Sequence, residues 1–330
     1  SDGRFIASTT SGRFYCFGDG ESDSASVVSH GSVMPPDKSH DASKVIEELD
    51  VDAGYCLLLG AGDASLLFDL LRQTTLTVYC IEPNPERRDA IRASLDEAGM
   101  LGTRAQLHDG SFGNLPYAPY CFNCIIWGDR VGSSAASVDF KGLYRSLRPW
   151  GGVAYEYSAY APDVTSRSRL AAAGIPEKEI TRGTFGVRVQ RGPLPGAGEW
   201  TRAHGNPGNT FSTTDSIVKL PLGILWWGGV GPDRIVTRHW RAPVPLFSKG
   251  HMFIQGQHDI IGVDAYTGRE MWNRHIRDVG RFPATFRGGN IITDGDCVYC
   301  VKGLTCYALD ATTGETVRRY THQLSPEQRE

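Results

Sequence analysis

The sequence lacks a long apolar run, since no stretch approaches the ~18 consecutive apolar residues that a membrane-spanning helix needs. This excludes a membrane span in this chain. It also lacks a charge imbalance, because 34 Lys and Arg residues stand against 37 Asp and Glu residues, a formal net charge of −3. Neither nucleic acid nor an anionic membrane surface is therefore expected as a partner.

No secretory signal peptide opens the chain, and its first residue is Ser1 rather than Met. Residues 3–18 already have the pattern of the middle of a β element, GRFIASTTSGRFYCFG. We therefore expect a piece of a longer protein, and for that reason the missing signal does not indicate a compartment.

The eight cysteines show no disulfide framework. Two C-x-x-C matches, Cys121 with Cys124 and Cys297 with Cys300, fall inside strand-like runs. Residues i and i+3 of a strand point to opposite faces of the sheet, so neither pair can hold one metal ion while extended. Unpaired structural cysteines are therefore expected, and no metal.

The histidines of the C-terminal half show no pairing at i, i+2 or i, i+4, the spacings at which two imidazoles on one element can share a metal ion. They are His204, His239, His251, His258 and His275. No metal site is expected there either.

The patterning divides the chain into four parts. Residues 1–18 predict paired strands, and residues 19–43 are rich in Ser, Asp, Gly and Pro, which is typical of a linker. Strand-like and helical runs alternate over residues 44–191, which predicts an α/β domain with a mostly parallel, doubly wound sheet of Rossmann-like type. After a Pro/Gly-rich stretch, short strands and many glycines fill residues 192–330 and predict an all-β region.

A repeat of 46 residues runs through this all-β region. FIQGQHDIIGVDAYTG (253–268) and YCVKGLTCYALDATTG (299–314) align without a gap, each with the pattern strand, turn, strand and Asp-x-x-Thr-Gly. A period of this length with strand pairs in each repeat predicts four-stranded propeller blades. The opening residues 5–18 fit the same hairpin with a longer turn, so the α/β domain is expected to be inserted in the propeller.

The run LLLGAGDASLLFDL (57–70) carries the clearest functional signal. An apolar strand ends in Gly60-Ala61-Gly62 and a helix follows, so free backbone N–H groups can hold a nucleotide-like ligand. The next strand-like run ends in Glu82 and Pro83, and the third ends before Asp109. This order predicts one ligand site built from three successive strand ends.

Residues 44–191 resemble a class I S-adenosylmethionine-dependent methyltransferase. The resemblance implies that Gly60-Ala61-Gly62 lies under the methionine part of the cofactor and that Glu82, with Pro83 beside it, accepts the ribose hydroxyls. It further implies that Asp109 binds the adenine amino group. Gly110 and Ser111 lie beside Asp109, and LRPWGG (147–152) resembles the Leu-Lys-Pro-Gly-Gly turn before the fifth strand. S-adenosylmethionine is thus the expected cofactor.

Several of these residues have other interpretations. An NAD-type dinucleotide site would want a third glycine where Ser65 stands, and it leaves Asp109 unexplained. Asp109 could serve only as a turn former before Gly110. Asp129, after the fourth strand, is the candidate catalytic residue that would orient the nucleophile, with a helix N-cap as its alternative. His108 is a spectator or, alternatively, a general base.

The flanking β regions resemble a PQQ-like β-propeller. Val263-Asp264-Ala265-Tyr266-Thr267-Gly268 with Trp272 fits the repeat of that family, whereas Arg318 stands in the tryptophan position of the second copy. The family's quinoprotein dehydrogenases carry adjacent paired cysteines, and this chain has none, so no PQQ is expected. Trp226 and Trp227 are interpreted as packing between blades, with a ligand platform as the alternative.

Three functions remain open at this level. The first is methyl transfer to an unidentified acceptor, with the propeller as scaffold or as the module that recruits a substrate or protein partner. The second is a non-catalytic binding protein whose methyltransferase-like domain is degenerate, and the third is a propeller oxidoreductase. An active methyltransferase implies the cytoplasm, where the cofactor is made, while PQQ-like propellers are commonly exported to places such as the periplasm.

Overall fold

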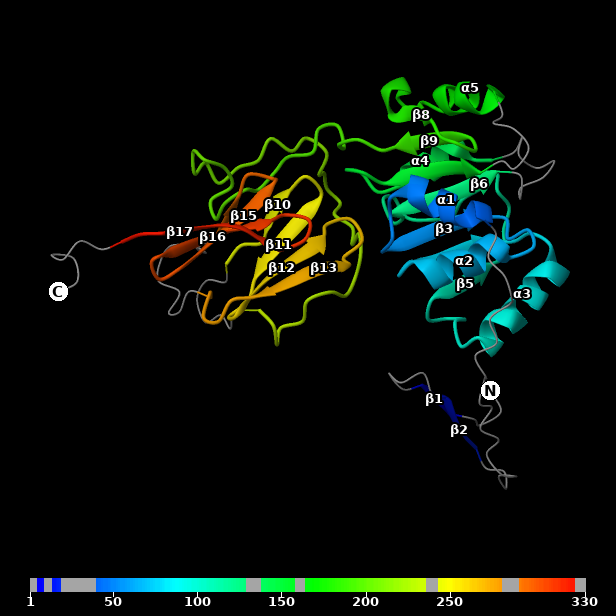
Figure 1. Ribbon diagram of the computed structural model, residues 1–330, viewed down its shortest axis with the longest axis horizontal. Coiled ribbons are helices and arrows are strands. Elements are labelled where there is room, and N and C mark those ends of the chain that lie inside the picture. The colour runs from blue at the N-terminus through cyan, green and yellow to red at the C-terminus, as the bar shows by residue number, and fades with distance from the viewer. Residues whose placement is uncertain are drawn as a thin grey trace.

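A computed structural model of the protein describes residues 5–8, 14–18, 40–128, 138–157, 164–235, 243–280 and 291–323. Figure 1 shows two lobes side by side, one built from α1–α5 with strands β3–β9 and one from strands β10–β17. A short hairpin of β1 (Phe5–Ser8) and β2 (Phe14–Phe17) stands apart from both lobes, and its strands pair only with each other. No helix among the described residues is long and apolar enough to cross a membrane.

The α/β lobe has a sheet of seven strands in the order β5-β4-β3-β6-β7-β9-β8. Strands β3 to β7 run parallel, and β9 is antiparallel to both of its neighbours. The elements in chain order are α1 His40–Leu49, β3 Tyr55–Leu59, α2 Ser65–Gln73, β4 Thr77–Ile81, α3 Pro85–Glu97, β5 Ala105–His108, β6 Cys124–Gly128, α4 Phe140–Ser146, β7 Val153–Tyr157, α5 Val164–Ala172, a 3-10 turn Glu177–Glu179, β8 Ile180–Arg182 and β9 Val187–Gln190. The expected mostly parallel, Rossmann-like sheet is confirmed.

Helices cover both faces of this sheet because the central strands are apolar on both sides. The side chains of α1, α2 and α3 pack on one face around Leu58, and those of α4 and α5 pack on the other around Leu57. Local signals set the helix starts: the side chain of Asn84 caps α3 by accepting the Arg87 N–H at 2.8 Å, and Pro85 follows at the first helical position.

One crossover differs from the rest. The connection from β5 to β6, residues 109–123, contains no helix and lies against the second face through the buried side chains of Phe112 and Leu115. The strand expected over 120–127 begins only at Cys124, which corrects that expectation. Tyr120, the first residue of that run, has a φ of 66° and is not extended, and continuous pairing with β3 and β7 starts only at Cys124. Cys124 therefore lies in the core on one face and Cys121 against the core on the other.

The second lobe consists of two four-stranded antiparallel meanders. The first has strands β10 Leu246–Ser248, β11 His251–Gln255, β12 Asp259–Asp264 and β13 Glu270–His275; the second has β14 Ile291–Thr293, β15 Cys297–Lys302, β16 Thr305–Asp310 and β17 Thr316–Thr321. Their facing sides form one apolar core that includes Phe253, Trp272 and Val298. The 46-residue repeat thus corresponds to one four-stranded sheet, and the described residues form two such sheets and no closed ring.

A tryptophan of the first sheet, Trp272, contacts the second sheet. The Trp272 indole N–H donates to the carbonyl oxygen of Ala311 at 2.9 Å, and the ring lies so close to Gly314 that a Cβ there would meet it at 2.5 Å. Forty-six residues earlier, Trp226 donates to Ala265 at 2.9 Å and lies over Gly268 in the same way. The repeat therefore extends back to Trp226, although residues around it form no strand.

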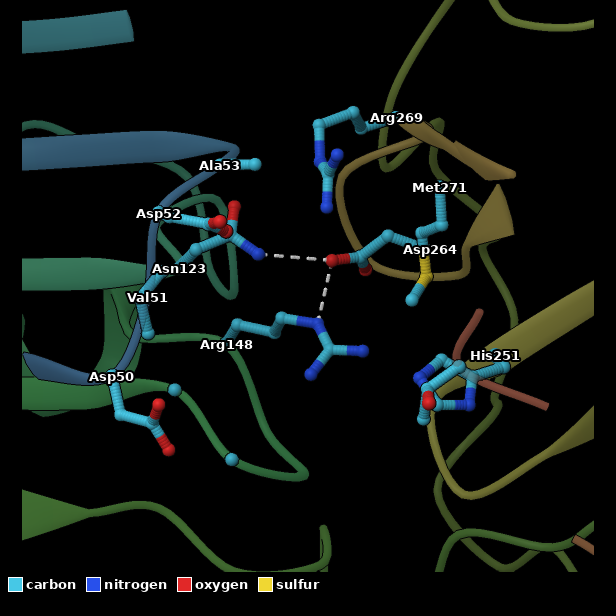
Figure 2. Close-up of a pocket in the computed structure, with 13 residues that line it drawn as sticks. Asp50, Val51, Asp52, Ala53, Asn123, Arg148, His251, Asp264, Arg269 and Met271 are labelled. Atoms are coloured by element: carbon cyan, nitrogen blue, oxygen red, sulfur yellow. Dashed lines mark hydrogen bonds and ion pairs between the residues drawn. The ribbon is translucent and has the colours of Figure 1, made fainter. Parts of the chain in front are cut away.

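The two lobes are joined by a buried ion pair (Figure 2). Arg148, in the turn before β7, places its Nε 2.6 Å from Oδ2 of Asp264, and Asn123 donates to the same oxygen at 3.0 Å. Only 9% of the Arg148 side chain and 2% of the Asp264 side chain are exposed. The other carboxylate oxygen of Asp264 accepts the backbone N–H groups of Tyr266 and Thr267, so one side chain shapes the turn and holds the α/β lobe.

We predict that Asp264→Asn lowers the free energy of unfolding by about 3–5 kcal/mol, because it leaves the Arg148 charge buried without its counterion. The matched control is Asp310→Asn. Asp310 makes the same turn hydrogen bonds to Thr312 and Thr313, and among the described residues no hydrogen bond or ion pair joins its side chain to the α/β lobe. That control should cost no more than about 1 kcal/mol. Urea unfolding measures both, and equal losses would show that the contact between the lobes contributes nothing.

The same pair predicts a loss of stability in acid. Burial raises the pKa of Asp264, but the Arg148 charge and the hydrogen bonds outweigh burial and hold this pKa below its ordinary value of 3.8. A lowered folded-state pKa stabilises the native state above the unfolded pKa, and this contribution disappears as pH falls through the folded pKa. The stability difference between the wild type and Asp264→Asn should therefore stay constant near neutral pH and shrink as pH falls from about 5 to about 2. A pH-independent difference would contradict this assignment.

Candidate cofactor-binding site

The glycine run lies at the point where the direction of winding of the sheet reverses. From β3 the chain moves outward through β4 to β5 and then returns to place β6 on the other side of β3. In sheets of this type ligands bind in the crevice at the carboxyl ends of the strands beside that reversal. Residues 60–64 follow directly on the carboxyl end of β3, so the turn and this crevice coincide.

The turn after β3 uses a left-handed backbone three times. Gly60 has a φ of 79°, Gly62 of 59° and Ala64 of 65°. Glycine adopts these angles without cost, whereas an alanine there is strained by about 1–2 kcal/mol. The Gly60 N–H donates to Ile81 at the end of β4 at 2.9 Å, which holds the turn against the neighbouring strand end.

Glu82 is the residue around which this site is built. It follows β4 directly and is only 2% exposed. Its Oε2 accepts the backbone N–H of Ala61 at 3.0 Å, and its Oε1 accepts that of Asn84 at 3.0 Å. Arg87 lies above it, with Nη1 3.6 Å from Oε2. A carboxylate offers about four acceptor positions, so capacity remains for two further donors such as vicinal hydroxyls.

Asp109 lies on the rim of the site, with 77% of its side chain exposed. Its carboxylate accepts from Arg88 Nη1 at 2.9 Å, and the same nitrogen donates to the backbone oxygen of Glu82 at 3.0 Å. Arg88 therefore ties the end of β4 to the end of β5. Pro83, Gly110 and Ser111 are likewise exposed.

His108, the last residue of β5, points away from the glycine turn. Its Nδ1 lies 2.8 Å from the hydroxyl of Tyr117, and the two rings are stacked. Burial lowers the pKa of His108, and the charge of Arg92 lowers it further. The neutral ring is thus favoured.

The structure brings together Gly60, Ala61 and Glu82 at one point of the sheet. It sets Asp109 at the neighbouring strand end but pairs it with Arg88. The candidate catalytic residue Asp129 lies outside the described residues, as does His239. Among the residues that the structure describes, no group of three or more His, Cys, Asp or Glu could hold a metal ion.

Sequence reasoning missed the arginines of this site. Arg87 and Arg88 are the third and fourth residues of a helix whose N-terminus is set by Asn84 and Pro85. A basic pair five residues after an acidic strand end is the signal that could have indicated them, because the helix start turns both side chains back toward Glu82 and Asp109.

A second hollow lies between the lobes, at the amino end of β3, whereas the glycine turn lies at the carboxyl end of the same strand. Figure 2 shows Asp50 and Asp52 on the α/β side and His251 and Arg269 on the other, around the Arg148–Asp264 pair. Its volume is about 440 Å³. It begins where β3 starts, whereas the glycine turn follows where β3 ends, so this hollow is separate from the candidate cofactor site.

No family model matches this chain, and no curated protein matches it. Solved structures are similar over less than half of its length. One from Methanococcus maripaludis, provisionally assigned as an S-adenosylmethionine-dependent methyltransferase, is 18% identical over 47% of this chain and 84% of its own, with a TM-score of 0.39. A SAM-dependent methyltransferase from Aquifex aeolicus is 16% identical over 46% of this chain and 88% of its own, with a TM-score of 0.36.

We predict that Glu82→Ala lowers the free energy of unfolding by about 1–3 kcal/mol even without a ligand, because it leaves the N–H groups of Ala61 and Asn84 without their acceptor. The control, Asp109→Ala, removes an exposed ion pair and should cost no more than about 1 kcal/mol. Chemical denaturation of both variants without added ligand measures this. A smaller loss for Glu82→Ala than for Asp109→Ala would contradict the role assigned to Glu82.

Proposed function

We propose that the α/β lobe binds S-adenosylmethionine at the carboxyl ends of β3 and β4 and transfers its methyl group to an acceptor. The single observation that supports this most directly is the buried carboxylate of Glu82, held against the glycine turn by the Ala61 N–H. An acidic side chain in that place can accept both hydroxyls of a ribose, and the resemblance of the sequence to class I methyltransferases implies this role.

In this proposal each residue of the site has one task. Gly60 and Gly62 let the backbone approach the methionine part closely, because neither carries a Cβ. Glu82 orients the ribose, and Pro83 lies beside it. Asp109, released from or shared with Arg88, binds the adenine amino group next to Gly110 and Ser111.

The cofactor when bound supplies an activated sulfonium methyl group for direct in-line displacement. The protein then contributes mainly proximity and orientation, together with removal of a proton from the acceptor where that is needed. Asp129 is the candidate for orienting the acceptor, since in the sequence it comes directly after Gly128, the last residue of β6.

For the second lobe we propose that the two antiparallel sheets are blades of a PQQ-like propeller that acts as a scaffold or recruits a substrate or partner. The 46-residue period, the four strands in each repeat and the repeated tryptophan contact of Trp226 and Trp272 support this. Bound PQQ forms no part of the proposal, because the chain lacks the paired cysteines of the quinoprotein dehydrogenases.

A second candidate function is a binding protein whose α/β lobe has lost activity. The strained left-handed backbone of Ala64, where a glycine would be unstrained, favours this alternative. The two candidate functions imply different compartments. A working methyltransferase requires the cytoplasm, and a non-catalytic propeller protein is compatible with export.

Isothermal titration with S-adenosylmethionine distinguishes the two candidates. We expect binding to the wild type and at least about tenfold weaker binding to Glu82→Gln, because a charged acceptor of two hydroxyls is lost. The matched control is Glu86→Gln, four residues along and exposed, which should bind like the wild type. Absence of binding at millimolar cofactor would contradict the methyltransferase proposal. The binding protein would then be the remaining candidate.

A further inference from the structure

The structure contains a cavity that the proposed function does not use. It has a volume of about 320 Å³ and lies between the α/β sheet and the segment that carries Trp226 and Trp227. We call it the aromatic pocket, after the rings of Tyr55, Tyr79, Tyr117, Phe122, Trp226 and Trp227 that line it. It lies on the face of the sheet, away from the glycine turn at the strand ends.

The aromatic pocket exists because one crossover lacks a helix. Helices α2, α3 and α4 follow β3, β4 and β6, but residues 109–123 after β5 form none. On the same face of the sheet Leu57 and Leu59 are completely buried, whereas Tyr55 and Tyr79 remain partly exposed. The missing helix leaves these two rings facing open space.

Contacts between the rings hold the walls of the pocket in place. The ring centroids of Tyr55 and Tyr79 are 6.1 Å apart, those of Tyr79 and Phe122 are 5.9 Å apart, and those of Tyr117 and Phe122 are 4.9 Å apart, all in edge-to-face arrangement. On the opposite wall Trp226 is held by its hydrogen bond to Ala265. Walls that are already ordered lose little side-chain entropy when a ligand binds.

The lining indicates the chemistry of the ligand. Among the residues that the structure describes, no charged side chain lines the aromatic pocket, so it favours an uncharged molecule. One lining residue, Thr267, has a buried hydroxyl oxygen without a hydrogen-bond partner among the described residues. In the second repeat the corresponding hydroxyl, that of Thr313, donates to Asp310 at 3.3 Å. The first repeat therefore leaves the hydroxyl of one lining residue without a hydrogen-bond partner among the described residues.

We propose that the aromatic pocket is a binding site for a neutral, planar aromatic molecule that carries one hydrogen-bonding group, which pairs with Thr267. The ring packs among the tyrosines and tryptophans, and the polar group satisfies the buried hydroxyl. A mostly apolar lining with very few polar groups is the usual composition of small-molecule sites, and the volume lies at the small end of their range. The site does not require the cofactor.

Two probes of matched shape test this proposal by isothermal titration: indole, which has an N–H group, and indene, which lacks it. We expect indole to bind the wild type with a dissociation constant of about 1 mM or tighter. Thr267→Val should weaken indole binding about three- to tenfold and leave indene binding unchanged, because only the hydrogen bond is lost. Equal weakening of both probes would overturn the role of Thr267.

A blocking variant tests the location. Ala118 is exposed at the edge of the pocket, so Ala118→Trp should fill it and abolish binding of both probes, while the control Ala118→Ser should bind as the wild type does. Unchanged binding to Ala118→Trp, or no binding of indole to the wild type, would overturn the proposal. Glu82→Gln should bind indole normally, which separates this site from the proposed cofactor site.

Discussion

The arrangement of the two lobes depends on one buried ion pair, that of Arg148 with Asp264. A charge removed from water is tolerated only where its partner and hydrogen bonds replace the lost hydration. Asp264 meets this requirement with both oxygens, one for the turn of its own sheet and one for Arg148 and Asn123. The hollow between the lobes and the second wall of the aromatic pocket are both positioned by this contact, because each is formed by residues from both lobes.

The candidate cofactor site depends on a similar replacement of water by backbone groups. Glu82 is buried and yet meets N–H groups from the glycine turn and from the start of α3. The parallel sheet makes this possible, because it brings the ends of β3, β4 and β5 to one edge. Residues separated by more than twenty positions thereby lie close together.

Much of this site could be predicted from the sequence, because its signals are local. Gly60, Gly62 and Glu82 directly follow apolar strands, and the mostly parallel sheet follows from the alternation of strand and helix patterns. The pairing of Arg88 with Asp109 and of Tyr117 with His108 could not be predicted, because each pair joins different elements or spans a turn whose path no periodicity describes. The late start of β6 was missed because YCFNCIIW has the composition of a strand throughout.

The sequence by itself determined most of the secondary structure of the α/β lobe and the 46-residue repeat, since periodicity, glycines and turn residues act over short distances. Only the tertiary structure decided which of two equivalent turns joins the lobes. Asp264 and Asp310 occupy the same position in the repeat, but Arg148 and Asn123 reach only the first. It also decided that Thr267 lacks the partner that Thr313 has. These differences come from contacts between elements far apart in the chain, and local sequence patterns therefore do not predict them.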